Sequence, residues 1–357
     1  MKTRPYKTKT STLIRLLLLG GICLTVISCA TKIQETESAF IDTMVTKHRF
    51  NGAELNELFE SVEIDDDILK KMTSPAEGLP WYKYRKIFMT EARIDGGVKF
   101  WRENRLALAA AEQRYGVPAE IIVAIIGVET NYGQNTGKHR VIDALSTLGF
   151  AYPPRSKFFL SELENFLLLC REERMNPLEP TGSYAGAMGM PQFMPSSFRV
   201  YAADYDNDGR RDIWHNSGDV IASVANYFAR HGWQAGQAIA LPVEFISGAA
   251  SQDAYKSALN IGNLKPDLRV GGLESLNLKI SSRPLPLDTK VKLLAFEQQP
   301  YGQGVVGQQP DGQKTNEELW AALDNFYCIT RYNHSPLYAM AVYQLSLSIL
   351  NKKGTFP

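Results

Sequence analysis

Residues 118–133 read PAEIIVAIIGVETNYG, an apolar run that is almost unbroken until Glu129. Pro118 suits the first helical position, because the N–H that proline lacks has no helical partner there. The run is apolar on nearly every side, which predicts a helix that is buried all round. Its isoleucines and valines also favour a strand, but the proline start and the length of the run favour a helix.

Glu129 follows directly after this run. An unpaired ionised carboxylate is costly in apolar surroundings, so desolvation should raise its pKa. The negative end of the helix dipole acts in the same direction. A carboxyl group that stays protonated near neutral pH can protonate a glycosidic oxygen. The alternative interpretation is that the carboxyl head reaches solvent past the last turn and has no catalytic role.

Apolar periodicity predicts most of the remaining elements. Helices are expected within 38–72, at 97–114 with Gly116 as the C-terminal cap, at 219–230, from about 317 and after 336. Full or partial alternation at 242–246, 276–280 and 290–296 predicts a small β-rich insertion. Residues 181–195, which are rich in Gly, Met and Pro, are expected to form a loop.

The N-terminus carries basic residues followed by a short apolar run at 16–27. This run falls short of the about 20 residues that a membrane span needs, and the pattern is typical of a cleaved secretory signal. It ends in Val26-Ile27-Ser28-Cys29, which resembles a lipobox, so Cys29 is expected to carry the lipid and to begin the mature chain. The alternative is an ordinary signal peptide in which Cys29 is incidental. Ala30 is not the Asp of an inner-membrane retention signal, which favours the outer membrane.

Composition narrows the classes of function. The chain has 357 residues, enough for one large domain or two smaller ones. Its net charge is +1 with the two signs interspersed, so no nucleic-acid partner is expected. Outside the signal and the proposed lipid site, the cysteines are Cys170 and Cys328. They can form a disulfide in an oxidising periplasm or remain buried thiols, and no Cys/His cluster has zinc spacing.

Two further segments carry polar residues in positions that suit a binding site. In the Gly-rich segment 182–195, Ser183 and Gln192 offer hydrogen-bonding groups, and glycines allow a ligand to approach the backbone closely. The alternative is a tightly packed internal loop. Asn333 precedes Ser335 and Pro336, which fit a helix start. Its side chain is expected either to cap that helix or to point into a cleft.

Taken together, the motifs resemble the membrane-bound lytic murein transglycosylase B family. They follow the family's order and are Trp81-Tyr82-Lys83-Tyr84, Val128-Glu129-Thr130-Asn131-Tyr132-Gly133, Gly186-Ala187-Met188-Gly189, Gln192-Phe193-Met194-Pro195-Ser196-Ser197, Ser223-Val224-Ala225-Asn226-Tyr227-Phe228, His231-Gly232-Trp233 and Arg331-Tyr332-Asn333. Residues 117–233 carry most of the likeness, whereas the tether and the β-rich insertion carry almost none.

The resemblance implies a mainly α fold of the α+β class. It would combine a lysozyme-like helical core, an additional helical domain and a small inserted β-rich domain. The implied parts are a signal peptide at 1–28, a tether at 29–37, a helical domain at 38–116, a catalytic core at 117–234 and 320–357, and the β-rich insertion at 235–319.

The resemblance also implies the roles of individual residues. Glu129 matches the family's single catalytic acid/base. The positions that match saccharide-binding residues are Ser183, Gln192, Tyr227, Tyr332, Asn333, Tyr84 and Arg155. One departure is Pro191, which stands where some relatives have Gly and removes a backbone donor.

A cation site is expected in the core at 204–219. Asp204, Asp206 and Asp208 alternate before Gly209, and the carbonyl of Arg210 follows, as in the opening of an EF-hand calcium loop. Its twelfth position is His215 in place of the usual Glu. The family places a later Asp there, which Asp219 matches. Calcium in a structural role is therefore expected, with an acidic turn that holds no metal as the alternative. No organic cofactor is expected.

The implied reaction is non-hydrolytic cleavage of the β-1,4 bond between N-acetylmuramic acid and N-acetylglucosamine. It leaves a 1,6-anhydro-muramoyl end. The expected partners are peptidoglycan glycan strands, the outer membrane on its periplasmic face through the lipid on Cys29, and other cell-wall enzymes. Two alternative functions remain: a hydrolytic muramidase, and a non-catalytic lipoprotein that binds peptidoglycan.

Overall fold

The computed structural model describes residues 22–73, 78–246, 254–260, 262–282, 284–299 and 317–354. Most of the expected signal peptide lies outside these residues, and so does the side chain of Cys29. The chain divides into two compact units, one made of 1–76, 135–202 and 208–215 and the other of 77–134, 203–207 and 216–357. The domain boundaries expected from the sequence stay predictions.

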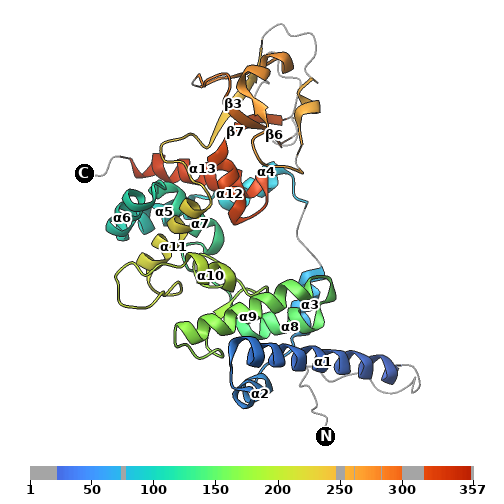
Figure 1. Cartoon of the computed structure of the whole chain (residues 1–357). Helices are drawn as coiled ribbons and strands as arrows, with labels where there is room; N and C mark the ends of the chain where they lie inside the picture. The colour runs from blue at the N-terminus through green and yellow to red at the C-terminus, as the bar shows by residue number, and fades with distance from the viewer. Residues whose placement is uncertain are drawn as a thin grey trace. The chain divides into compact units, whose positions relative to one another are not determined.

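The first unit is helical, with α8 and α9 side by side and α1 packed against α2 and α8 (Figure 1). Three rings hold its core together: Phe40, Phe59 and Phe150 meet with centroids 5.9 to 6.1 Å apart. Its elements are α1 (Ile22–His48), α2 (Gly52–Glu60), α3 (Asp66–Thr73), β1 (His139–Arg140), α8 (Val141–Ala151), η1 (Pro153–Arg155), α9 (Ser156–Glu172), β2 (Thr181–Gly182) and α10 (Pro195–Tyr201).

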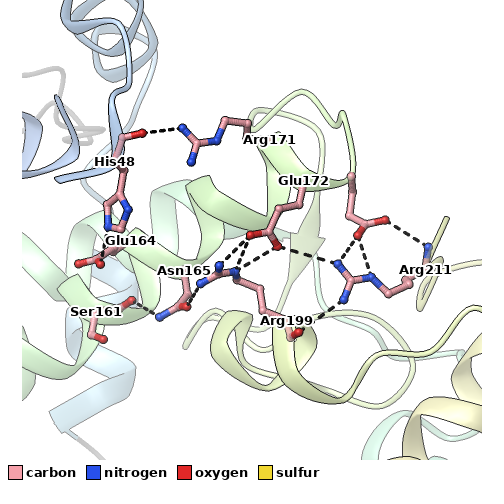
Figure 2. A network of polar contacts seen from close by, with 9 residues as sticks. His48, Ser161, Glu164, Asn165, Arg171, Glu172, Arg199 and Arg211 are labelled. Atoms are coloured by element: carbon pink, nitrogen blue, oxygen red, sulfur yellow. Dashed lines mark hydrogen bonds and ion pairs between the residues drawn. The ribbon is translucent and has the colours of Figure 1, made fainter. Parts of the chain in front are cut away.

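A polar network fastens α10 to α9. Figure 2 shows Arg199 of α10 donating to both carboxylate oxygens of Glu172 and to Asn165 Oδ1. Deeper in the unit, the buried Glu162 accepts from the backbone N–H of Ser196 at 2.9 Å and from its hydroxyl at 2.7 Å. These contacts fix the point where the Gly-rich loop enters α10.

The second unit is built around the apolar run that follows Pro118, which forms α7 (Ala119–Thr130). Residues 121–127 are buried, and α5, α6, α11 and α13 all pack against this helix. The helical prediction is therefore confirmed and the strand alternative is wrong, since burial on every side favours the apolar residues whatever their β propensity. The helices of this unit are α4 (Trp81–Phe88), α5 (Glu91–Glu103), α6 (Arg105–Tyr115), α7, α11 (Ser217–Arg230), α12 (Asp324–Tyr332) and α13 (Pro336–Lys353).

The helix expected at 97–114 is divided at Asn104 into the end of α5 and the whole of α6. Asn104 turns the chain between them, and its amide donates back to the carbonyl of Phe100 at 2.9 Å. Gly116 caps α6 with a φ of 71°, in the left-handed region, as predicted.

The β-rich insertion is confirmed as a five-stranded antiparallel sheet in the order β4-β6-β7-β3-β5. Its strands are β3 (Ala240–Phe245), β4 (Leu268–Arg269), β5 (Leu278–Ile280), β6 (Lys290–Glu297) and β7 (Glu317–Ala322). Tyr255, Leu278, Leu293 and Ala321 are buried in its core.

One predicted helix is wrong. The segment from Glu317 forms β7, and the helix α12 begins only at Asp324. Glu, Leu and Ala favour helices, which explains the error. However, β7 pairs with β3 on one side and β6 on the other, so hydrogen bonds to two neighbouring strands outweigh the local propensity.

Candidate active site

Glu129 lies in the last turn of α7, where the chain makes a tight left-handed exit. Asn131 and Tyr132 have φ values of 51° and 60°, and their N–H groups donate back to carbonyls of the helix. The Tyr132 ring folds over Gly127, where an added Cβ would come within 2.6 Å of the ring hydroxyl. Its hydroxyl donates to the carbonyl of Arg93 at 2.8 Å. Gly127 thus allows the turn that ends the helix at Thr130, one residue after Glu129.

Among the described residues, one polar side chain bonds to the Glu129 carboxyl, and no local sequence pattern predicts it. The Tyr338 hydroxyl donates to Glu129 Oε1 at 2.5 Å. Tyr338 is only 3% exposed and lies in the first turn of α13. Ser335 caps that helix by accepting from the backbone N–H of Tyr338, and Pro336 is its first residue, as predicted. The cap therefore fixes where the phenol stands.

Burial dominates the electrostatics of this carboxyl. It raises the pKa of Glu129 to about 7, while the hydrogen bond from Tyr338 acts in the opposite direction. Glu129 is half-buried, so its head keeps some access to solvent. The negative charge of Glu129 contributes to raising the pKa of Tyr84, Tyr332 and Tyr338. These three phenols therefore lie within electrostatic reach of the carboxyl.

An aromatic cluster adjoins this group. Tyr227 stands 4.8 Å from Tyr332 between ring centroids, and it stacks on His231 at 4.0 Å. The Tyr227 hydroxyl donates to the carbonyl of Arg331 at 2.5 Å, which joins α11 to the end of α12. Asn333 follows at the C-terminal end of α12 and is exposed. The second unit thus brings Tyr84 and Tyr332 near Glu129 and packs Tyr227 against Tyr332. Asn333 belongs to the same unit and follows Tyr332 in the chain.

The other predicted binding residues, Ser183, Gln192 and Arg155, belong to the first unit. The Ser183 hydroxyl accepts from the N–H of Ala187 at 3.1 Å. The Gln192 amide donates to the carbonyls of Thr136 and Gly189 at 3.1 and 2.9 Å. The Arg155 guanidinium lies over the rings of Phe158 and Phe159, 4.6 and 5.1 Å from their centroids.

The expected cation ligands are brought together in part. Carboxylate oxygens of Asp204, Asp206 and Asp219 lie within 4.8 Å of one another. Asp219 is fully buried and accepts from the N–H of Tyr205 at 2.7 Å. A buried carboxylate is costly without a compensating charge, and carboxylate oxygens are the ligands that a hard cation such as calcium prefers. The residues present therefore fit calcium. Asp208 and Arg210 belong to the first unit and are not in this group.

Cys170 and Cys328 are both free, buried thiols, and burial raises the pKa of each to about 12. The disulfide alternative is therefore not realised in the structure. Among the helices in the described part of the chain, none is both long enough and apolar enough to cross a membrane.

Residues 32–347 match the family of the transglycosylase SLT domain. The chain belongs to this family. It is 41% identical over 322 residues to the membrane-bound lytic murein transglycosylase B of Escherichia coli K12, a match that covers 87% of this chain and 81% of that protein. The chain is therefore an enzyme of the lytic transglycosylase class that acts on peptidoglycan.

Solved structures of this family have the same fold. The soluble lytic transglycosylase SltB1 of Pseudomonas aeruginosa is 45% identical, with a TM-score of 0.79 over 90% of this chain and 100% of that one. The Escherichia coli lytic transglycosylase Slt35 in complex with calcium is 39% identical, with a TM-score of 0.76 over 89% and 93% of the two chains. The lysozyme-like α+β fold class predicted from the sequence is thereby confirmed.

A less similar solved structure contains ligands. SltB3 of Pseudomonas aeruginosa is 29% identical, with a TM-score of 0.73 over 89% of this chain and 79% of that one. Its complexes contain NAG-anhNAM-pentapeptide and NAG-NAM-pentapeptide.

Proposed function

We propose that Glu129 is the single general acid and base of this lytic transglycosylase. The reaction would cleave the β-1,4 bond between N-acetylmuramic acid and N-acetylglucosamine without water. The observation that carries the proposal is a half-buried carboxyl with a pKa of about 7, held by a 2.5 Å hydrogen bond at the end of a buried helix. Near neutral pH such a group is partly protonated and partly ionised, so it is ready for both proton transfers.

The chemistry needs one carboxyl group used twice. Protonated Glu129 first gives its proton to the leaving glycosidic oxygen. Ionised Glu129 then takes the proton of the C6 hydroxyl of the muramic acid, whose oxygen forms the new bond to C1. The atoms balance without a water molecule, because the C6 oxygen replaces the leaving oxygen and a 1,6-anhydro ring results. Tyr338 stabilises the ionised state between the two steps, because its hydroxyl donates to the carboxylate.

Hydrolytic glycosidases usually pair two carboxyl groups. Among the described residues of its own compact unit, no second carboxylate contributes to the pKa of Glu129. That supports a mechanism without a protein nucleophile. The SltB3 complex with an anhydro-muramoyl ligand supports the same product class for this family. The saccharide-binding roles of Tyr84, Arg155, Ser183, Gln192, Tyr227, Tyr332 and Asn333 stay part of the proposal.

Mass spectrometry of the muropeptides released from purified sacculi tests the reaction. We expect products whose reducing ends are lighter by one water than hydrolysed ends. Release of hydrolysed ends would instead favour the muramidase. Binding to sacculi with no released muropeptide would favour the non-catalytic lipoprotein.

We further propose that the acidic group of Asp204, Asp206 and Asp219 binds a structural calcium ion. Asp208 and the carbonyl of Arg210 stay ligands expected from the EF-hand-like sequence pattern alone. The buried Asp219 supports this, as does the calcium complex of the Escherichia coli relative. The positive charge of the ion would offset the cost of burying the Asp219 carboxylate. It would also stabilise the loop that contains Asp204 and Asp206. It has no part in the proton transfers.

We also propose that a lipid on Cys29, exposed by cleavage of the signal peptide, anchors the enzyme to the periplasmic face of the outer membrane. The lipobox-like sequence and the membrane-bound relative support this. Other cell-wall enzymes remain expected partners.

A further inference from the structure

A pocket of 440 Å³ opens between α4 and the sheet of the second unit. Its floor is rigid. The Trp81 ring is only 3% exposed and lies 5.2 Å from the Phe296 ring. The Trp81 indole donates to Glu318 Oε1 at 2.7 Å, and Gln298 donates to the other oxygen at 3.2 Å. Both oxygens of Glu318 are thus held in place, so the floor carries a fixed negative charge.

The rim of this pocket carries opposite charges on its two sides. Arg85 stands on α4 and Glu297 at the end of β6, and both are exposed. Within the described part of the chain, neither side chain has an ion pair or a side-chain hydrogen bond. The neighbouring Lys86 Nζ donates a hydrogen bond to Gln299 Oε1 at 3.3 Å. The Arg85 guanidinium and the Glu297 carboxylate therefore line the same cavity, and both can form hydrogen bonds and ion pairs with a ligand.

Such a pocket suits a ligand that carries a carboxylate and an ammonium group. A guanidinium binds a carboxylate through two parallel hydrogen bonds, whereas Glu297 and Glu318 offer oxygens to an ammonium group. Tyr82 and Met89 add apolar surface for short aliphatic side chains. The glycan backbone carries no ammonium group, and its lactyl groups carry no carboxylate charge while they are amide-linked to peptide. The stem peptides on peptidoglycan carry free carboxylates and, where the diamino acid is not cross-linked, an ammonium group.

The pocket also lies beside the proposed reaction centre. Helix α4 contributes Tyr84, which Glu129 reaches electrostatically, and Arg85 is the next residue. The Tyr84 ring stacks on Trp81 in the pocket floor, with centroids 6.5 Å apart. Helix α4 thus contributes Tyr84 near Glu129 and Trp81 and Arg85 to the pocket.

We propose that the pocket between α4 and the ends of β6 and β7 binds the stem peptide of the glycan strand being cleaved. The proposal rests on the proposed function, because it concerns the same bound strand. It gives the β-rich insertion a role in choosing between glycans with and without peptides.

The test compares cleavage of two substrates made from the same sacculi: glycan strands that keep their stem peptides, and strands from which an amidase has removed them. The variants are Arg85→Gln and Glu297→Gln. Matched controls are Arg105→Gln and Glu274→Gln, which change exposed residues of the same unit that do not line the pocket. The readout is the ratio of kcat/KM on peptide-bearing strands to kcat/KM on stripped strands.

We expect the two pocket variants to lower that ratio by on the order of tenfold each, as for the loss of one charge-assisted hydrogen bond, and the controls to leave it as in the parent enzyme. An unchanged ratio in both pocket variants would overturn the proposal. A parent enzyme that cleaves neither substrate would instead refute the proposed function.

A binding measurement decides the pocket's role independently of catalysis. Calorimetry with the free stem peptides released by the amidase should show binding to the parent protein. It should show a roughly tenfold higher Kd for Arg85→Gln. No detectable binding of these peptides to the parent protein, together with an unchanged substrate ratio, would show that the pocket holds no peptide.

Discussion

The Tyr338 hydroxyl donates to Glu129 Oε1 across 2.5 Å, although the two residues stand 209 positions apart in the chain. Two opposing effects meet at this bond. Burial makes ionisation of the carboxyl costly, and the phenol makes it easier. Their balance leaves a pKa of about 7, where a single group can act as acid and then as base.

Replacing the carboxyl should abolish the reaction. Glu129→Gln keeps the shape of the side chain but can neither deliver a proton to a leaving oxygen nor accept one from the C6 hydroxyl. General acid/base help is worth about 10²–10⁴-fold. Because one group performs both transfers, we expect a loss at or beyond the upper end of that range, with glycan binding retained. Sacculus solubilisation and a pull-down on insoluble peptidoglycan measure the two properties. Substantial lytic activity in this variant would remove Glu129 from the mechanism.

Removing only the phenol hydroxyl should shift the pH profile. Tyr338→Phe deletes a bond that favours the ionised carboxylate, so the pKa of Glu129 should rise above its value of about 7. Free enzyme needs the protonated carboxyl, so kcat/KM falls as the pH rises through this pKa. We expect that alkaline limb to move to higher pH in the variant. Tyr343→Phe is a matched control, since Tyr343 lies on the same helix and donates to the carbonyl of Ala240. A limb at the same pH in parent and variant would show that Tyr338 does not tune the carboxyl.

The same carboxyl should make stability depend on pH. Its pKa is about 7 in the folded protein and 4.5 in the absence of burial. Between these values the folded state binds more protons than the unfolded state, so stability falls as the pH rises through this window. Glu129→Gln removes this dependence. The difference in Tm between the variant and the parent should therefore grow in favour of the variant from pH 5 to about pH 8. This corresponds to a change of at most about 3 kcal/mol in their relative free energies of unfolding. A constant Tm difference across that range would contradict the raised pKa.

Calcium should raise the Tm of the enzyme. A ligand that binds only the folded state stabilises it by mass action, so excess calcium and a chelator should give different melting temperatures. Asp204→Ala and Asp208→Ala should each reduce that difference. Asp42→Ala, which changes an exposed acidic residue of α1, should not. If the parent melts at the same temperature with calcium and with chelator, these carboxylates hold no working calcium site.

Lipid attachment should be separable from activity. Cys29→Ala should give a folded enzyme that still solubilises sacculi but no longer partitions with membranes, because an acyl anchor rather than the fold holds it there. Membrane fractionation with the parent as reference measures this. Membrane association as strong as that of the parent would count against the lipoprotein assignment.

The local sequence pattern predicts the buried helix and the position of Glu129 in its last turn, because the apolar run and the carboxylate that follows it are adjacent in the sequence. Tyr338 was not predictable in this way, since its only link to Glu129 is the packing of α13 on α7. The helix expected from Glu317 failed for a similar reason. Its residues favour a helix by themselves, and only pairing with β3 and β6 makes them a strand. Of the proposed calcium ligands, Asp204, Asp206 and Asp219 were expected from spacing and likeness, and the structure brings their carboxylates together.

Because Tyr338 lies 209 positions after Glu129, the two halves of their hydrogen bond are made at different times during synthesis. Ribosomes make the N-terminal residues first, so Glu129 exists long before α13 does. Until Pro336–Lys353 has been made and docked, the carboxyl lacks its phenol partner and α7 lacks one of the helices that bury it. A chain cut short before Pro336 therefore carries the glutamate without the surroundings that tune it.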